Sequence, residues 1–461
     1  MNGKYYLYAV SSKYDPVLKR AKKISGRLLG KIDEQNGFVE SSKDKLRNAV
    51  GLPKISDNLT TKDFGTQELI LKLASKQLEA LEKVFEEDAR AMFLFAFLRL
   101  TEQSPIKNVL FYYLHSYWSQ TWPAAKVSDK DISLLLRRVG ENRTKIMEYQ
   151  KLFFKEEETV LLDMTHVITH SHKLESAQSG YNNSMSFKPQ VNLMYLFSAQ
   201  QHEPIYYRLV PGNIRDVKAF TLSIQECKLQ NIMLIADKGF YSKKNIAELD
   251  QPKLSYIIPL QRGSSLIEYP KPNDEANKIW DGYFTFNGTI IWYKAKTNVT
   301  LYLNQALKIA EEKDYFTRVE GQKEKYSMDN FYKKKMHFGT LALLSKHKDK
   351  TAEQIYTSYK SRTNVETMFD AYKNIIDADK TYMQNEAAME GWMFVSHIAL
   401  QMYYIIYEQL NQQKILKKYS VSDFLKFTHR IKKIKINDNW YTSEVTKPIK
   451  TLLDKIGLDI T

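Results

Sequence analysis

The spacing of apolar and polar positions divides the chain into segments with different secondary structure. Short apolar runs separated by polar turns predict a small β-unit over residues 1–60. From Thr61 the leucines recur at helical spacing and lead into a dense apolar block at residues 92–98, so residues 61–157 are predicted to be helical. The strands of the β-unit are predicted at residues 5–10, 22–32 and 37–40.

Two helices around a glycine are predicted near the end of the helical region. Ser128 is a good N-cap, Gly140 is expected to end the first helix, and a second helix starts close behind it. This layout permits a helix-turn-helix in which Arg143 and Lys145 face DNA. Simple packing of the two helices against each other stays open as the alternative.

The central segment, residues 158–260, has a different pattern of predicted secondary structure. Apolar runs and capped polar stretches alternate there in the order strand, strand, strand, helix, strand, helix. Asp216 and Ser242 are the predicted caps of the two helices. This order is that of the first part of a ribonuclease-H-like domain. The strands are predicted at residues 159–163, 191–198, 205–210 and 232–237.

A β-rich insertion is predicted next, because a hairpin pattern with Asn287-Gly288 at its turn interrupts the alternation. A strand-like run at residues 340–344 then resumes the interrupted domain. We therefore expect an α/β multi-domain protein: a mixed sheet with flanking helices, interrupted by the insertion, with a β-unit and a helical DNA-binding region before it. The predicted regions are 1–60, 61–157, 158–260, 261–338, 339–413 and a basic C-terminal region 414–461.

A stretch of polar residues within the resumed domain carries candidate chemistry. Residues 351–389 contain no Gly or Pro, which predicts a helix. At about 100° per residue, one narrow stripe of that helix collects a phenol, two cations and a carboxylate. A salt bridge at i,i+4 between the arginine and the glutamate would explain part of the stripe without any function. The residues of the stripe are Tyr359, Arg362, Glu366 and Lys373.

Charge makes a polyanion the expected partner. The chain carries 68 Lys and Arg against 53 Asp and Glu, a net charge of +15, which favours nucleic acid first and a membrane surface second. Residues 13–31 hold seven basic residues and one Asp, so Lys22 and Lys23 are candidate phosphate contacts. A lysine-protected sheet edge is the alternative. No stretch is apolar and long enough to cross a membrane.

The cysteine and histidine residues limit which disulfide or metal sites the chain can form. A single cysteine, Cys227, excludes an internal disulfide framework and fits a reducing cytoplasm. The histidines at 166, 170 and 172 lack cysteine partners or a second ligand pair, so we expect a solvated or DNA-facing cluster rather than a zinc site.

Three carboxylates form the candidate catalytic set. Asp163 and Asp237 end predicted buried strands, and Glu366 lies on the helical stripe. Such a set suits Mg²⁺, which prefers oxygen ligands, and can hold two ions for an in-line phosphoryl displacement. Each aspartate alone could be a turn or a cap residue, but the three together are harder to explain that way.

These motifs resemble those of a known family. Asp163, the DKGFYS segment at residues 237–242, the PGNIRD loop at residues 211–216 and the pattern Y-x2-R-x3-E-x6-K are similar to a prokaryotic insertion-sequence transposase of the DDE type. The resemblance covers residues 159–410.

The resemblance implies a cut-and-paste reaction on DNA. Asp163, Asp237 and Glu366 would bind two Mg²⁺ ions, or Mn²⁺ as a substitute, while Tyr359, Arg362 and Lys373 would contact phosphates of the terminal inverted repeats. Hydrolysis would free a 3′-OH that attacks target DNA. Because two ends must be joined, we expect a homodimer on DNA, and the cysteine content favours the cytoplasm as its location.

In relatives that form a hairpin intermediate, a tryptophan of the insertion stacks on a flipped base. Trp292 is the candidate and Trp280 the alternative. A metal-dependent nuclease without strand transfer and a non-catalytic DNA-binding regulator remain the rival interpretations.

Overall fold

The computed structural model divides the chain into two compact units, which are described separately below. The first comprises residues 1–62 and 433–443, and the second residues 63–432 and 444–461. The described residues are 5–33, 36–43, 45, 59–171, 173–179, 188–213, 221, 223, 226, 231–250, 254–270, 279–321, 326–347, 349–436 and 438–460.

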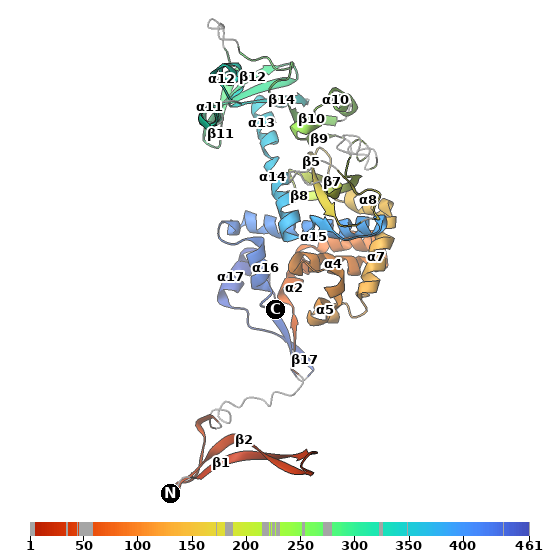
Figure 1. Ribbon diagram of the computed structural model, residues 1–461, viewed down its shortest axis with the longest axis vertical. Helices are drawn as coiled ribbons and strands as arrows, with labels where there is room; N and C mark the ends of the chain where they lie inside the picture. The colour runs from red at the N-terminus through yellow and green to blue at the C-terminus, as the bar shows by residue number, and fades with distance from the viewer. Residues whose placement is uncertain are drawn as a thin grey trace. The chain divides into compact units, whose positions relative to one another are not determined.

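The first unit contains the predicted three-stranded β-unit (Figure 1, red). Its antiparallel strands are β1 (Tyr5–Asp15), β2 (Arg20–Asp33) and β3 (Gly37–Glu40), in that order across the sheet. Nearly every side chain of β1 and β2 is exposed to solvent, on both faces. A second small sheet joins β4 (Thr60–Asp63), β16 (Lys432–Ile436) and β17 (Asn439–Thr442).

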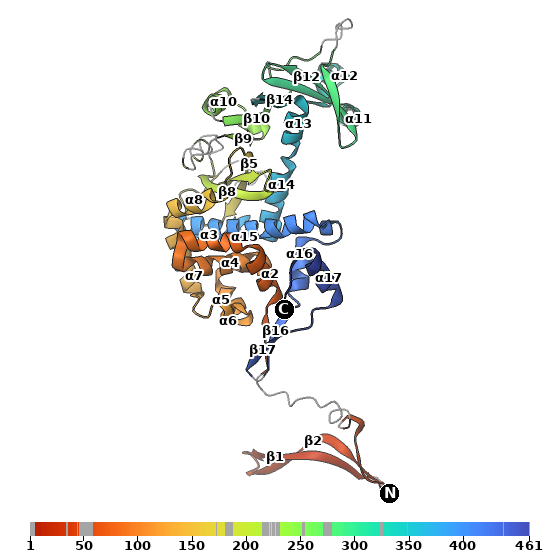
Figure 2. The same cartoon turned by 180° about the vertical axis from the view of Figure 1, so that it is seen from behind.

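The helical region of the second unit packs around the long helix α15 (Glu386–Gln412) (Figure 2). The helix α4 (Ala89–Glu102) is buried on nearly all sides, as the dense apolar block predicted. The other helices of this region are α2 (Gly65–Leu73), α3 (Ser75–Phe85), α5 (Val109–His115), α6 (Trp118–Thr121), α7 (Asp129–Glu141) and α8 (Arg143–Lys151), with short 3₁₀ turns at Glu86–Asp88 and Ile106–Asn108.

The crossing of α7 and α15 corrects one prediction about helix ends. Ser128 caps α7 through a capping box, as expected, but Gly140 lies inside the helix, which continues to Glu141. A Cβ at Gly140 would lie 1.7 Å from the carbonyl oxygen of Ala387 on α15. Gly140 is therefore required for close helix packing and does not stop the helix.

The core of the second unit is a mixed sheet with the strand order β10-β9-β5-β7-β8 at its centre. Strand β7 runs antiparallel to β5, whereas β9 and β10 run parallel to it. This is the ribonuclease-H-like arrangement, so the predicted fold class is confirmed. The strands are β5 (Thr159–Thr169), β6 (Gln178–Ser179), β7 (Pro189–Ser198), β8 (Glu203–Pro211), β9 (Ile232–Ile235) and β10 (Leu254–Pro259).

Two predicted features of this domain need qualification. Strand β5 continues six residues beyond Asp163, so this residue lies inside a strand rather than at its end. The helix α10 (Lys243–Leu249) begins after Ser242, whose side chain accepts a hydrogen bond from the Asn245 amide, as predicted. Most of the helix predicted to start at Asp216 lies outside the described residues, as does Cys227.

The insertion extends the central sheet instead of forming a separate one. Strands β11 (Gly282–Phe286), β12 (Thr289–Lys296) and β13 (Val299–Asn304) pair in sequence, and β13 pairs with β14 (Thr340–Lys346). Both turn residues of the predicted hairpin, Asn287 and Gly288, have positive φ, as a type I′ turn requires.

The helices α11 (Gln305–Gly321) and α12 (Met328–Lys334), followed by a 3₁₀ turn at Lys335–His337, were not predicted. The reason is that α11 buries only Tyr315, so the helix lacks the apolar stripe by which a sequence reveals one.

The C-terminal part of the second unit completes the domain. Helix α13 (Ala352–Lys360) and helix α14 (Thr363–Asp370) lead into a π-helical turn, η5 (Ala371–Ile375), and strand β15 (Lys380–Thr381) pairs with β5. After α15 come a 3₁₀ turn at Ile415–Lys417, α16 (Val421–Thr428) and α17 (Lys447–Lys455). In the described part of the chain, no helix is both long and apolar enough to span a membrane.

Candidate active site

Neighbouring parallel strands bring the first two candidate carboxylates to the same level of the sheet. Leu161 on β5 pairs with Ile235, the last residue of β9, and Asp163 and Asp237 each follow this pair by two residues, which brings them to the same end of the two strands. Adjacent strands lie about 4.8 Å apart. A tight 3₁₀ turn, Lys238–Phe240, follows Asp237 and turns the chain away from the sheet.

One guanidinium group connects all three candidate carboxylates. Arg362 Nη2 donates a hydrogen bond to Asp163 Oδ2 at 2.9 Å, and Arg362 Nη1 lies 3.4 Å from Asp237 Oδ1 and 3.5 Å from Glu366 Oε1. The Arg362 side chain is only 14% exposed, whereas that of Glu366 is 58% exposed. The expected Arg362–Glu366 pair therefore exists, but it is the most solvated of the three.

Burial dominates the electrostatics of this cluster. Burial raises the pKa of the Asp163 carboxyl, the Asp237 charge raises it further, and Arg362 only partly offsets both. For Arg362, burial lowers the pKa, but the charges of Asp163 and Asp237 outweigh this and leave it raised. Asp163 thus remains costly to ionise even beside a cation, so additional positive charge at this point would stabilise its charged form.

The prediction of a single helix over residues 351–389 is wrong. The structure has α13, α14 and the π-helical turn η5 up to Ile375, then strand β15, and α15 begins at Glu386. Between α13 and α14 the amides of Arg362 and Val365 bond to the carbonyls of Tyr359 and Arg362, three residues back instead of four. This local tightening turns the Arg362 guanidinium toward the sheet, where it meets Asp163. Lys373 lies in the π-helical turn η5, a feature often found at functional sites.

The two remaining members of the predicted stripe are half-buried. Burial raises the pKa of the Tyr359 phenol, and the nearby Arg362 partly offsets this. Burial lowers the pKa of His166 on β5, and the positive charge of Lys373 adds to the effect, which puts Lys373 in the neighbourhood of that strand.

The donor set of the site suits a hard divalent cation. Three carboxylate oxygens lie within 3.5 Å of one guanidinium, and oxygen donors of this kind are the ligands of Mg²⁺. Across the described ranges, no trio of His, Cys, Asp or Glu converges closely enough to hold a metal ion as it stands. The Arg362 guanidinium stands among the three carboxylates, which accounts for their separation.

Trp292, the residue predicted to stack on a base, is half-buried on β12. Its ring lies 5.3 Å from that of Tyr283, the residue opposite it on β11. Trp280 is also half-buried and packs against the main core.

Arg143, the first predicted DNA contact in the helical region, is half-buried, with 26% of its side chain exposed. Its guanidinium pairs with Glu390 at 2.8 Å and donates to the Tyr207 carbonyl at 3.0 Å. Lys145 is more exposed and lies 3.9 Å from Glu86. The surroundings of Arg143 indicate a packing role, and DNA reading by this helix pair stays a prediction.

Lys22 and Lys23 lie on the exposed strand β2. Lys22 stands directly opposite Lys13 on β1, and like charges in this position repel each other. An anion bound between them would remove that cost.

The predicted histidine cluster is spread out in the described residues. His170 stacks on Tyr382 at 5.1 Å, His166 is half-buried, and His172 lies outside the described residues.

Sequence reasoning missed a pair of side chains that hold the end of the helix bearing Lys373. Arg99 is 2% exposed and donates to the carbonyls of Ile376 and Asp377, while Gln103 donates to the carbonyls of Asn374 and Ile375. The one available signal was an arginine within the apolar block of α4, where a charge needs a buried partner.

Comparison with known proteins points to one family. A family model described as "Transposase DDE domain" matches residues 154–402. Among solved structures, a cryo-EM structure of the piggyBac transposase synaptic complex with hairpin DNA is similar at 11% identity and a TM-score of 0.41, covering 75% of this chain and 70% of that one.

The Mos1 transposase in its paired-end complex with the left transposon end is similar at 14% identity and a TM-score of 0.15, covering 37% of this chain and 57% of that one. No curated protein matches the chain.

Proposed function

Because this chain belongs to the transposase DDE domain family, and is therefore a divalent-metal-dependent DNA transposase, we propose that Asp163, Asp237 and Glu366 are its catalytic carboxylates. The observation that carries the proposal is the convergence of all three on the Arg362 guanidinium. Two of these carboxylates come from neighbouring strands and the third from a helix far along the chain. A purely structural ion pair would need only one of them.

The carboxylates would hold two Mg²⁺ ions, with Mn²⁺ as a substitute, and ions so placed can activate an attacking hydroxyl and stabilise the leaving oxygen. Asp163 is the ligand that gains most, because its burial makes the charged form costly without added positive charge. Asp237 and Glu366 are more exposed and complete the set from two other directions.

Arg362 has a second role once DNA is bound. When its carboxylate partners are neutralised, the guanidinium becomes available to a phosphate, to which it can donate two parallel hydrogen bonds. Its buried Nε has no hydrogen-bond partner among the described residues, so donor capacity remains. Tyr359 and Lys373 are proposed as further phosphate contacts.

The proposed reaction is cut-and-paste transposition. Water hydrolyses the phosphodiester at the end of the element and frees a 3′-OH, and this hydroxyl then attacks a target phosphodiester and displaces a 3′-oxygen. Two ends must be joined, so we propose a homodimer in the DNA complex. Lys22 and Lys23 would bind DNA beside the ends, and Trp292 would stack on a flipped base if a hairpin forms.

The decisive experiment compares Asp237→Asn with the wild-type protein on labelled element ends in Mg²⁺. We expect the variant to lose cleavage and strand transfer while it binds the ends as tightly as the wild type. Asp250→Asn is the matched control, because Asp250 is an exposed carboxylate paired with Lys346. Nicked ends without joined products would favour a nuclease, and absence of cleavage by the wild-type protein would favour a regulator.

A further inference from the structure

A polar cleft lies at the far end of the helix that carries Glu366. It has a volume of about 510 Å³ and is formed by the end of α4, the π-helical turn η5 and helix α16. Helix α16 also packs against α2 (Figure 2). Most of its lining side chains are polar or cationic, among them Thr101, Gln103, Asn374, Ser422, Lys426 and Arg430.

The structure separates the cations of the basic C-terminal region into two groups. Lys432 is paired with Asp63, and Lys435 lies 3.1 Å from Asp438, so each of these two already has a carboxylate partner. Lys426 and Arg430, both exposed on the cleft wall, have no ion pair with a carboxylate in the described part of the chain. Hydrogen bonds from Ser420 lower the pKa of the Asp423 carboxyl and the charge of Lys426 adds to this, but neither cation is held in an ion pair with a described carboxylate, so the two supply the accessible positive charge of the cleft.

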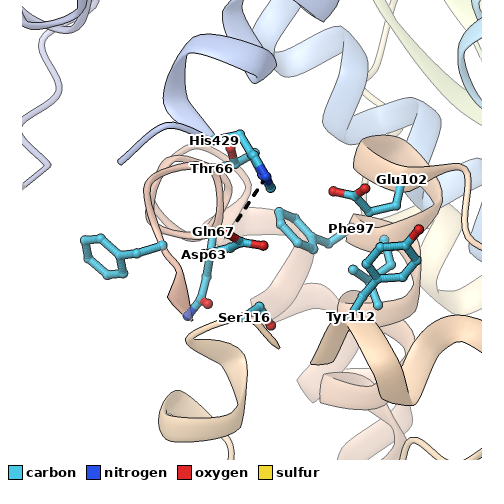
Figure 3. Close-up of a pocket in the computed structure, with 10 residues that line it drawn as sticks. Asp63, Thr66, Gln67, Phe97, Glu102, Tyr112, Ser116 and His429 are labelled. Atoms are coloured by element: carbon cyan, nitrogen blue, oxygen red, sulfur yellow. Dashed lines mark ion pairs between the residues drawn. The ribbon is translucent and has the colours of Figure 1, made fainter. Parts of the chain in front are cut away.

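The floor of the cleft offers one carboxylate, that of Glu102, against the two cations on the wall. Glu102 and His429 belong both to the cleft and to a small pocket below it, in which His429 turns toward Asp63 (Figure 3). Burial and the charge of Asp63 raise the pKa of Glu102, and Lys432 partly offsets this; Glu102 is the one carboxylate among the described residues that line the cleft. The pocket itself is too small for more than about one water molecule.

The position of the cleft relative to the active site indicates what it binds. Asn374, on the cleft wall, follows Glu366 by eight residues on nearly continuous helical backbone, a distance of about 12 Å at 1.5 Å per residue. A DNA strand advances about 3.4 Å per nucleotide along a duplex axis. For a strand that runs along this helix, Asn374 is therefore three to four nucleotides away from a phosphate held at the carboxylates.

We propose that this cleft holds the backbone of the DNA strand that continues from the active site. Lys426 and Arg430 contact its phosphates. The Ser422 hydroxyl and the second amide hydrogen of Asn374, whose first is donated to Asp370, add hydrogen bonds to it. The proposal rests on the proposed function, since it takes the carboxylates as the point where the scissile phosphate lies. It adds a second DNA contact site, whose two cations lie outside the residues that the family model matches.

Salt-dependent binding tests the charge argument without requiring catalysis. The double variant Lys426→Gln/Arg430→Gln is made in an Asp237→Asn background, and binding to element ends is measured by fluorescence anisotropy over a range of salt concentrations. Each lost phosphate contact reduces the slope of log K against log salt by about one, so we expect the slope to fall by about two. The charge-matched control, Lys447→Gln/Lys450→Gln on α17, should keep the parental slope.

The outcomes separate this proposal from the proposed function. A steep parental slope that the cleft variant leaves unchanged, or that the control variant reduces equally, would overturn the cleft as a phosphate site. A parental protein that does not bind the ends at all would instead contradict the proposed function.

Site-directed cross-linking tests the position of the strand. Ser422→Cys is introduced into a Cys227→Ser protein, and DNA ends carrying a thiol tether on successive phosphates are offered for disulfide formation. The yield should peak three to four nucleotides from the cleavage site, with none at Thr451→Cys on α17. Uniformly low yield at every phosphate, or a peak elsewhere on the DNA, would refute the assignment.

Discussion

The substitution Arg362→Gln tests whether one guanidinium holds the three carboxylates together. Breaking a fully buried ion pair by removing one partner costs about 3–5 kcal/mol, whereas exposed pairs contribute about 0–1 kcal/mol. Arg362 and Asp163 are mostly buried, with exposed fractions of 14% and 19%, while Glu366 is more than half exposed. We therefore expect the free energy of unfolding to fall by about 2–4 kcal/mol at neutral pH.

The loss should depend on pH with a definite sign. The pKa of Asp163 is already above its ordinary value of 3.8 in the folded protein, so ionising it costs stability as pH rises through that pKa. Without Arg362 the pKa rises further and the cost increases. The difference in stability between the variant and the wild type should thus be small near pH 4 and grow as the pH rises to 7.

Urea unfolding at several pH values, with and without saturating Mg²⁺, measures these effects. Metal should restore most of the lost stability, because it supplies the positive charge that Arg362 provided. The control is Arg138→Gln, which removes an exposed pair with Asp88 and should change stability by less than about 1 kcal/mol, with no response to metal. A pH-independent loss that Mg²⁺ does not reverse would refute the electrostatic account.

Three further changes test the packing that supports the site. Gly391→Ala should lower the free energy of unfolding, measured in urea, by about 1–3 kcal/mol, because the added Cβ would lie 2.1 Å from the Leu136 carbonyl oxygen. Gly321→Ala is the control, because a Cβ at position 321 would meet no atom within 4 Å. Arg99→Lys should lower stability by about 1–3 kcal/mol, since a lysine cannot bridge the carbonyls that the guanidinium bonds, and an unchanged unfolding midpoint would contradict this role. His397 is fully buried, and burial lowers its pKa to about 3. Between pH 6.5 and 4.5 the unfolded chain takes up a proton at this histidine and the folded protein does not, so the free energy of unfolding should fall by about 2–3 kcal/mol. The variant His397→Phe should lack this part of the pH dependence.

Local patterns in the sequence were sufficient for much of the fold. The apolar period and the turn chemistry, which are properties of neighbouring residues, predicted the strands of the β-unit, the Asn287-Gly288 hairpin and the succession of strands and helices along the central domain. Helices α11 and α12 escaped prediction because they bury few side chains and so leave no periodic apolar signal. Gly140 was misjudged because its requirement for a missing Cβ comes from α15, far along the chain.

The same contrast between local sequence patterns and tertiary contacts holds for the candidate site. The sequence by itself identified Asp163, Asp237, Arg362 and Glu366, because buried strands, a helix and a recurring spacing can be recognised without coordinates. Only the tertiary structure decided that Arg362 reaches all three carboxylates, because that contact depends on the β5–β9 register and on the tightened turn between α13 and α14.

Tertiary structure also decided which individual cations form ion pairs within the protein. Arg143, Lys432 and Lys426 look alike in the sequence, yet the first is half-buried and paired with Glu390, the second is paired with Asp63, and the third lines an open cleft. The sequence determines how much charge a segment carries. Which charges remain available to a phosphate depends on the carboxylates that folding brings beside them, since an ion pair formed within the protein leaves less positive charge for DNA.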